Sequence, residues 1–260
     1  MQAIADECRV LLRACRAPDA AAPAIASRVH ARAYELLGCS DPYLALKRQS
    51  NDQARAVCRS VAPTLATFRD FVLASVIANT FDYGVQHHQV TDDFLRYFRE
   101  KYVEGFFVDD TGPMLGIARS NARIVYLTDN AGEIVFDALL IRHLRSLGAD
   151  VTLAVKGAPI LNDATLEDAR EFGLDRIASR LTTTGSGRIG IDLDCAPPDL
   201  LDAIGRATLI IAKGMANYES LTEYGGLPPI AYCMAVKCDT IAESVGVPRG
   251  SMVAMLDAAR

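Results

Sequence analysis

The 260-residue chain carries 27 basic and 32 acidic residues, for a net charge of −5, and half of its residues are hydrophobic. That is enough apolar material for one large domain, or for a domain with a smaller companion. Aromatic residues make up only 7%, Trp is absent and no block of Lys or Arg occurs, which argues against a nucleic-acid partner. No apolar run reaches the roughly 18 residues of a membrane span, and the first residues do not resemble a signal peptide. We therefore expect a cytoplasmic protein without a membrane partner.

The seven cysteines are odd in number, and none of them belongs to a Cys-x-x-Cys pair. The four histidines include no pair at metal-ligand spacing, so the sequence argues against a structural zinc site. We expect reduced, mostly buried thiols, as is usual in a cytoplasm.

The first part of the chain predicts helices and no strand up to about residue 104, because its apolar residues recur at helical spacing. Asp41 is expected to cap one helix, with Pro42 at the first helical position, and Thr91 to cap another. Gly38 and Gly84 are expected to end helices. The predicted helices cover residues 24–38, 41–61, 64–84 and 91–105.

After Arg119 the pattern changes to short apolar runs rich in β-branched residues. Strands are predicted at 123–129, 150–157 and 207–214, and helices at 134–147, 165–172 and 231–245. Strands that alternate with helices indicate parallel β-α-β units. We therefore predict a helical N-terminal subdomain over residues 1–115. Residues 116–260 are expected to form a three-layer α/β/α Rossmann-like domain with a mostly parallel sheet.

Polar side chains follow the predicted strands, at the sheet edge where open parallel sheets bind ligands. Asp and Asn oxygens suit a hard divalent cation such as Mg²⁺ or Mn²⁺, and lysine suits phosphate. Gly132 opens a helix whose free N–H groups favour an anion, and it is expected to let the backbone approach a ligand. The residues concerned are Asp129, Asn130, Asn162, Asp163, Lys213, Asn217, Glu219 and Lys237.

Each of these motifs, taken alone, is also compatible with a structural role. Asp129 or Asp163 could be a helix N-cap, and Lys213 or Lys237 could be the solvated end of an element. The functional interpretation depends on their coincidence, because all of them follow strands of one predicted sheet. Together they indicate a metal-assisted phosphoryl site.

Four segments occur in an order that resembles the DUF89 family, the damage-control phosphatases or ARMT1-like metal-binding proteins. They are "LTDNAGE", "GAPILNDATLEDA", "IIAKGMANYESL" and "AVKCDTIAESVGVPRGSMV", and "DPYLALKRQSN" and "IANTFDYG" resemble the helical part of that family. The resemblance runs from Asp41 to Val253. The chain lacks the N-terminal Cys-x-x-Cys that small prokaryotic members often carry, which puts an accessory metal site in doubt but not the main one.

The resemblance implies a divalent-metal-dependent phosphatase acting on a small phosphorylated metabolite, such as a sugar phosphate or a phosphopantetheine-like compound. One ion, Mg²⁺, Mn²⁺, Co²⁺ or Ni²⁺, would be held by Asp129, Asn130 and Asp163. The residues implied to contact the substrate, the last two on weaker grounds, are Lys213, Gly214, Asn217, Lys237, Asn79 and Asp82.

Three alternatives stay open at this point. Asp129 could be the nucleophile of a covalent aspartyl-phosphate mechanism, although the position two residues on, where such enzymes carry a second acid, is Ala131. A Rossmann-like transferase is disfavoured because no Gly-x-Gly-x-x-Gly follows the first strand. A metal- or ligand-binding protein without turnover is compatible with the same residues. The sequence leaves the oligomeric state open.

Overall fold

The computed structural model describes residues 2–14, 22–80, 90–119 and 121–258. In these ranges the α-helices are α1 (Gln2–Ala14), α2 (Ala22–Leu37), α3 (Leu44–Val61), α4 (Phe68–Ala78), α5 (Val90–Glu104), α6 (Thr111–Ala118), α7 (Ile134–Ser146), α8 (Leu166–Glu171), α9 (Leu174–Ile177), α10 (Pro198–Gly205), α11 (Gly214–Leu221) and α12 (Asp239–Val245). The strands are β1 (Val108–Asp109), β2 (Arg123–Leu127), β3 (Asp150–Val155), β4 (Arg180–Thr183), β5 (Leu209–Lys213), β6 (Ile230–Ala235) and β7 (Met252–Asp257). Single 3-10 turns lie at Ala62–Thr64 and Leu193–Cys195.

The described strands form a seven-stranded sheet in the order β1-β7-β6-β5-β2-β3-β4. Five neighbouring strands, β6, β5, β2, β3 and β4, run parallel, and β7 is antiparallel to β6. Leu127 at the end of β2 pairs with Ala154 of β3 and Ala212 of β5. The chain therefore leaves these three strands at the same level, and the residues that follow them share one edge of the sheet.

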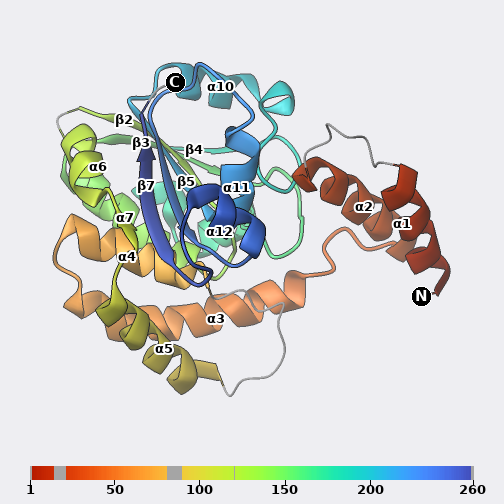
Figure 1. Ribbon diagram of the computed structural model, residues 1–260, viewed down its shortest axis with the longest axis horizontal. Coiled ribbons are helices and arrows are strands. Elements are labelled where there is room, and N and C mark those ends of the chain that lie inside the picture. The colour runs from red at the N-terminus through yellow and green to blue at the C-terminus, as the bar shows by residue number, and fades with distance from the viewer. Residues whose placement is uncertain (1, 15–21, 81–89, 120, 259–260) are drawn as a thin grey trace.

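Alternate residues of the strands enter two separate cores, which makes the molecule three-layered. Ile124 and Tyr126 of β2 pack in a core with α3, α4, α5 and α7, whereas Val125 and Leu127 face α10, α11 and α12. Figure 1 shows α3, α4, α5 and α7 gathered on one side of the molecule, apart from the blue helices α11 and α12. The predicted α/β architecture with a mostly parallel sheet is confirmed.

One hydrophobic core joins the helical N-terminal residues to the sheet. Ala54 of α3 and Val72 of α4 lie in the same cluster as Ile124 of β2, and α4 also packs on β6 and β7. Strand β1 precedes residue 115 and pairs with β7. Helices α3, α4 and α5 thus form part of one outer layer of the α/β structure. The division into two parts at residue 115 stays a prediction.

Several predicted strands and helices differ from the observed ones in type or in extent. The segment 231–235, predicted as helix, is the buried strand β6, and helix follows only from Asp239. A continuous apolar run cannot be assigned to helix or strand by periodicity alone. Strands β4 and β7, at 180–183 and 252–257, were not predicted; β7 is also mostly apolar, whereas β4 has a single apolar residue, Leu181.

Helix ends differ from prediction where side-chain caps decide them. Helix α4 begins four residues later than predicted because Thr67 and Asp70 form a capping box, and it ends at Ala78. Helix α3 begins at Leu44, after a turn in which Tyr43 N donates to Asp41 Oδ1. Thr91 already lies inside α5. The predicted end at Gly84 falls outside the described residues.

Helices α1 and α2 pack against each other at the periphery of the molecule (Figure 1), and the guanidinium of Arg32 in α2 donates to the carboxylate of Glu7 in α1.

None of the helices in the described part of the chain is long and apolar enough to cross a membrane.

The described cysteines are free thiols. Cys58 and Cys233 are buried, but Cys39 and Cys195 are exposed, so the expectation of mostly buried thiols is wrong. Burial raises the pKa of Cys233 to about 12, which makes this thiol unreactive. Cys15 falls outside the described residues.

Candidate functional site

The loops after β2 and β3 are joined, and they bring together the three residues predicted to bind metal. The backbone of Asn130 pairs with Asp163 in an isolated antiparallel bridge. On either side of this bridge, Ala164 N donates to Asp129 O at 2.8 Å and Ala131 N donates to Asn162 O at 2.8 Å. Asp129, Asn130 and Asp163 are therefore held next to one another by main-chain hydrogen bonds.

Two asparagine side chains orient the Asp129 carboxylate. Asn130 Nδ2 donates to Asp129 Oδ2 at 3.0 Å and to Glu133 Oε2 at 3.1 Å. Asn79 Nδ2, at the end of α4, donates to the same two oxygens at 2.8 and 2.6 Å. Carboxylates only accept hydrogen bonds, so the amide nitrogen of Asn130 must face them. Its Oδ1, a potential metal ligand, then lies on the opposite branch of the amide.

Acidic side chains crowd around Asp129. Burial, followed by repulsion from Glu133 and Asp163, raises the pKa of Asp129 to about 8, while Lys237 and the Asn79 hydrogen bond oppose the shift. Asp163 is 5% exposed, and its Oδ2 lies 3.3 Å from the ammonium of Lys156. A divalent cation placed among these oxygens would relieve the repulsion.

The donor set fits a hard cation that keeps water ligands. Two carboxylates and one amide supply oxygen only, as Mg²⁺ and Mn²⁺ prefer. Within the described residues, no group of three or more His, Cys, Asp or Glu side chains is arranged to hold a metal ion. Asn130 and solvent would therefore have to complete the shell around Asp129 and Asp163.

Glycine is required at two positions near the site for different structural reasons. Gly214 has a φ of +75°, and a Cβ on it would lie 2.0 Å from Asp129 Oδ2. Only glycine allows the start of α11 to approach that carboxylate so closely. A Cβ on Gly132 would instead lie 2.2 Å from Ser50 Oγ of α3. The expectation that Gly132 makes room for a ligand is wrong, because it makes room for a helix.

Lys213 lies beneath the site rather than facing it. The side chain is fully buried, and its Nζ donates to Glu133 Oε1 and Asp137 Oδ1 at 2.8 Å each and to Ser75 O at 3.2 Å. Burial lowers the pKa of Lys213, but attraction by Asp137 and Glu133 outweighs burial and raises it above its ordinary value. An ammonium has three donors and all are used, so this geometry does not support the predicted contact with phosphate.

The two acids paired with Lys213 were not singled out in the sequence. Glu133 and Asp137 are four apart, hence on one face of a helical turn, and both are fully buried. Asp137 Oδ1 also accepts from Ser75 Oγ at 2.6 Å and from Tyr126 OH at 2.7 Å. The spacing of these two acids by four residues, at the start of a predicted helix, was the sequence signal that could have identified them.

Asn79 and Asn217 also make internal hydrogen bonds, and their contact with substrate stays a prediction. Asn217 Nδ2 donates to Thr128 O at 3.0 Å and to Lys213 O at 2.8 Å, which ties the end of β2 to the start of α11. Asn79 uses both amide hydrogens on the carboxylates, and its Oδ1 accepts from Ala235 N at 3.3 Å. Asp82 lies outside the described residues.

Lys237 remains the best-placed cation for a phosphate. It is half-buried, it follows β6, and it is close enough to Asp129 to influence its pKa. The side chain also lines a cavity of about 250 Å³. Lys156 is 3% exposed and is held by Asp163 and by Gly190 O, so it supports the loop after β3.

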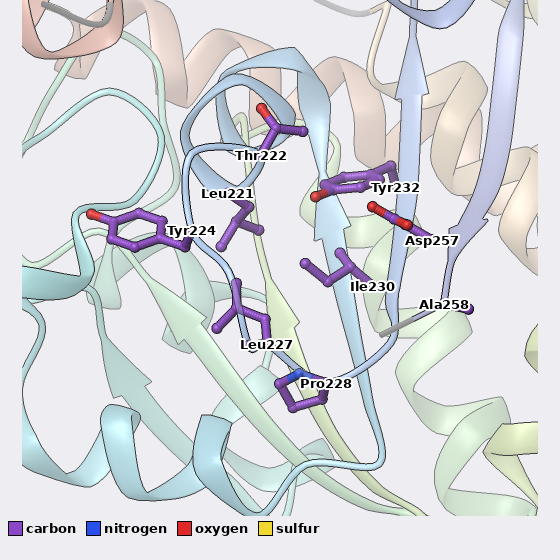
Figure 2. A pocket seen from close by; sticks show the side chains of 10 residues that line it. Leu221, Thr222, Tyr224, Leu227, Pro228, Ile230, Tyr232, Asp257 and Ala258 are labelled. Carbon is purple, nitrogen blue, oxygen red and sulfur yellow. The ribbon is translucent and has the colours of Figure 1, made fainter. Parts of the chain in front are cut away.

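A different pocket, drawn in Figure 2, lies at the other edge of the sheet. Ile230 at the start of β6 and Asp257 at the end of β7 line it, with Leu221, Tyr224 and Leu227. Its volume of about 30 Å³ admits little more than a water molecule. None of the predicted site residues lines it.

Comparisons with known proteins show the family of this chain. A family model, the damage-control phosphatase ARMT1-like domain, matches residues 1–253. An Archaeoglobus fulgidus protein named damage-control phosphatase is 43% identical over 235 residues, 88% of this chain and 81% of that protein. A Pyrococcus horikoshii damage-control phosphatase is 33% identical over 242 residues, 90% of this chain and 82% of that protein.

A crystal structure of a DUF89 family protein from Pyrococcus horikoshii has the same fold, with a TM-score of 0.90 at 29% identity. The match covers 98% of this chain and 88% of that one. The names of the relatives support a phosphatase role. The resemblance in the sequence motifs is confirmed, and this chain belongs to the damage-control phosphatase ARMT1-like family, DUF89.

Proposed function

We propose that this protein is a divalent-metal-dependent phosphatase that hydrolyses the phosphomonoester of a small phosphorylated metabolite. One observation supports this above all. Main-chain hydrogen bonds hold Asp129, Asn130 and Asp163 together, and burial, followed by repulsion from Glu133 and Asp163, raises the pKa of Asp129 to about 8. A sugar phosphate or a phosphopantetheine-like compound is the proposed kind of substrate.

Asp129, Asn130 and Asp163 would hold the ion, and Mg²⁺, Mn²⁺, Co²⁺ and Ni²⁺ are the candidates. When bound, the ion supplies a Lewis acid for the phosphoryl group and lowers the pKa of a water molecule. Lys237 would neutralise charge on the phosphoryl oxygens, and loss of such a contact costs on the order of 10²–10³ in rate.

The buried residues would keep the site in its working geometry. Asn79 and Asn130 fix Oδ2 of Asp129, which leaves Oδ1 of Asp129 for the ion. Lys213 holds Glu133 in place, and Glu133 in turn accepts from both asparagines. Rigid donor atoms reduce the reorganisation required as charge develops on the substrate.

A covalent mechanism through Asp129 is the mechanistic alternative. Two amides already engage Oδ2 of Asp129, and the position two residues on is the buried Ala131, which cannot act as an acid or base. Direct attack by water is therefore the proposed route. A stoichiometric burst of product in rapid-mixing kinetics, with a trapped phosphoenzyme, would instead support the covalent route.

A phosphometabolite panel tests the proposal. The chelated protein is assayed for phosphate release with each of the four metals, beside the Asp129→Ala and Asp163→Ala variants. We expect release only after metal is added, and loss of release in both variants while they remain folded. Metal binding without turnover of any compound would favour a non-catalytic binding protein. Release that persists in chelator would contradict metal dependence.

A further inference from the structure

A groove begins beside Lys237, and none of the residues that line it comes from the loops after β2 and β3. Its first part is the cavity of about 250 Å³, lined by Lys237, Arg249, Tyr97 and Met252 among others. A second cavity of about 290 Å³ shares Arg249 and Met252 with the first and continues to Lys101. The two adjoining cavities are called the cationic groove below.

The groove has a positive lining in which Arg249 is the least compensated charge. Lys101 Nζ is bound to Glu104 at 2.6 Å, and that acid lines the groove as well. The carboxylate recorded with Arg249 is Asp239, at 3.9 Å, and the two side chains are 65% and 79% exposed. An exposed pair at such a distance contributes little, so the guanidinium of Arg249 is available to a ligand.

The remaining walls suit the carbon skeleton of a small molecule. Met252 is 3% exposed and the half-buried Tyr97 contributes an aromatic ring. A phosphate beside Lys237 would place its leaving group in the groove, with Arg249 on the wall. A guanidinium binds carboxylate or phosphate oxygens in bidentate geometry, which an uncharged hydroxyl cannot match.

We propose that the leaving group of the substrate carries a second anionic group, a carboxylate or a further phosphate, which Arg249 binds in the cationic groove. This inference rests on the proposed function and narrows its substrate class. It assigns phosphorylated acids and bisphosphates as preferred substrates over monophosphates of uncharged alcohols. Arg249 is then a specificity residue that contacts the part of the substrate away from the reacting phosphorus.

Matched substrate pairs test this inference. 3-Phosphoglycerate is compared with glycerol 3-phosphate for the carboxylate, and fructose 1,6-bisphosphate with fructose 1-phosphate for the second phosphate. Each pair is assayed with the metal-loaded wild type, with Arg249→Gln, and with Arg206→Gln as control. Arg206 is equally exposed, pairs with Asp202 at 2.8 Å and lies before β5, at the opposite edge of the sheet.

In at least one pair, we expect wild-type kcat/KM to favour the member with the second anion. Arg249→Gln should lower kcat/KM for that member by roughly 10- to 100-fold, the range expected for a lost charge-assisted hydrogen bond. The uncharged member should change less than about twofold, and Arg206→Gln should leave both unchanged. The pair that responds identifies the anion as carboxylate or phosphate.

Equal losses on both members of each pair, or no loss, would overturn the assignment of Arg249 while leaving the phosphatase proposal intact. Calorimetric binding of the same compounds to the metal-loaded protein is measured in parallel. If none of the four compounds is hydrolysed, the assignment of Arg249 is judged by affinity alone, and the phosphatase proposal is decided by the wider panel of phosphometabolites. Equal affinities of wild type and Arg249→Gln for these compounds would overturn the assignment of Arg249. A loss of affinity confined to the compounds with a second anion would support it.

Discussion

Lys213→Met should destabilise the fold strongly. The ammonium of Lys213 is fully buried and is the cation bound to both Glu133 and Asp137. Methionine fills the space of the stem but leaves two buried carboxylates without that counter-charge. Removal of one partner from a buried ion pair costs about 3–5 kcal/mol, which is a large part of a typical stability of about 5–15 kcal/mol.

Urea denaturation of the metal-free variants, followed by circular dichroism, measures this cost. Lys237→Met is the matched control, because the same change at a half-buried lysine should cost no more than about 1 kcal/mol. Adding Asp137→Asn to Lys213→Met should recover part of the loss, since one of the two stranded charges is removed. A loss below about 1 kcal/mol for Lys213→Met, or no recovery in the double variant, would refute a role as buried counter-charge.

Two further predictions concern the carboxylate of Asp129, which is proposed to bind the metal. Gly214→Ala should weaken divalent-metal binding in a calorimetric titration, because its Cβ would meet Asp129 Oδ2. Gly226→Ala is the control, since Gly226 also has a positive φ but has open space around it, and this change should cost only about 1–2 kcal/mol of stability. Equal metal affinities of the two variants would refute the prediction. The folded-state pKa of Asp129, about 8, lies above its ordinary 3.8, so between these values the folded metal-free chain holds a proton that the unfolded chain releases. The free energy of unfolding should therefore fall as pH rises from about 4 to about 8, and Asp129→Asn should remove that part of the fall in denaturation curves recorded across this range; an identical pH profile in the variant would contradict the shift.

The convergence of Asp129, Asn130 and Asp163 could be predicted because parallel strands end at one edge, and a strand end is readable from apolar runs followed by polar residues. The role of Lys213 could not be read in this way. Lys213 is the last residue of β5, and which face its side chain takes depends on the register with β2 and β6. That register turns it inward, toward buried acids that the sequence places 76 and 80 residues away.

The contribution of α4 was equally hard to read from the chain. Asn79 and Asp129 are 50 residues apart, and their contact depends on α4 packing against α7 and the sheet. Residues 231–235 of β6 were predicted as helix because they form an apolar run with no alternation of polar residues, and in the structure every residue of this strand is buried. In both cases tertiary packing decided what local pattern could not.

The most direct test of the central claim is anomalous diffraction from crystals soaked in Mn²⁺. One peak should appear with oxygen–metal distances of about 2.0–2.3 Å to the side chains of Asp129, Asn130 and Asp163. The peak should be absent from crystals of Asp129→Ala grown under the same conditions. A Mn²⁺ ion bound elsewhere, in a protein whose phosphatase activity requires the metal, would contradict the assignment of these three residues.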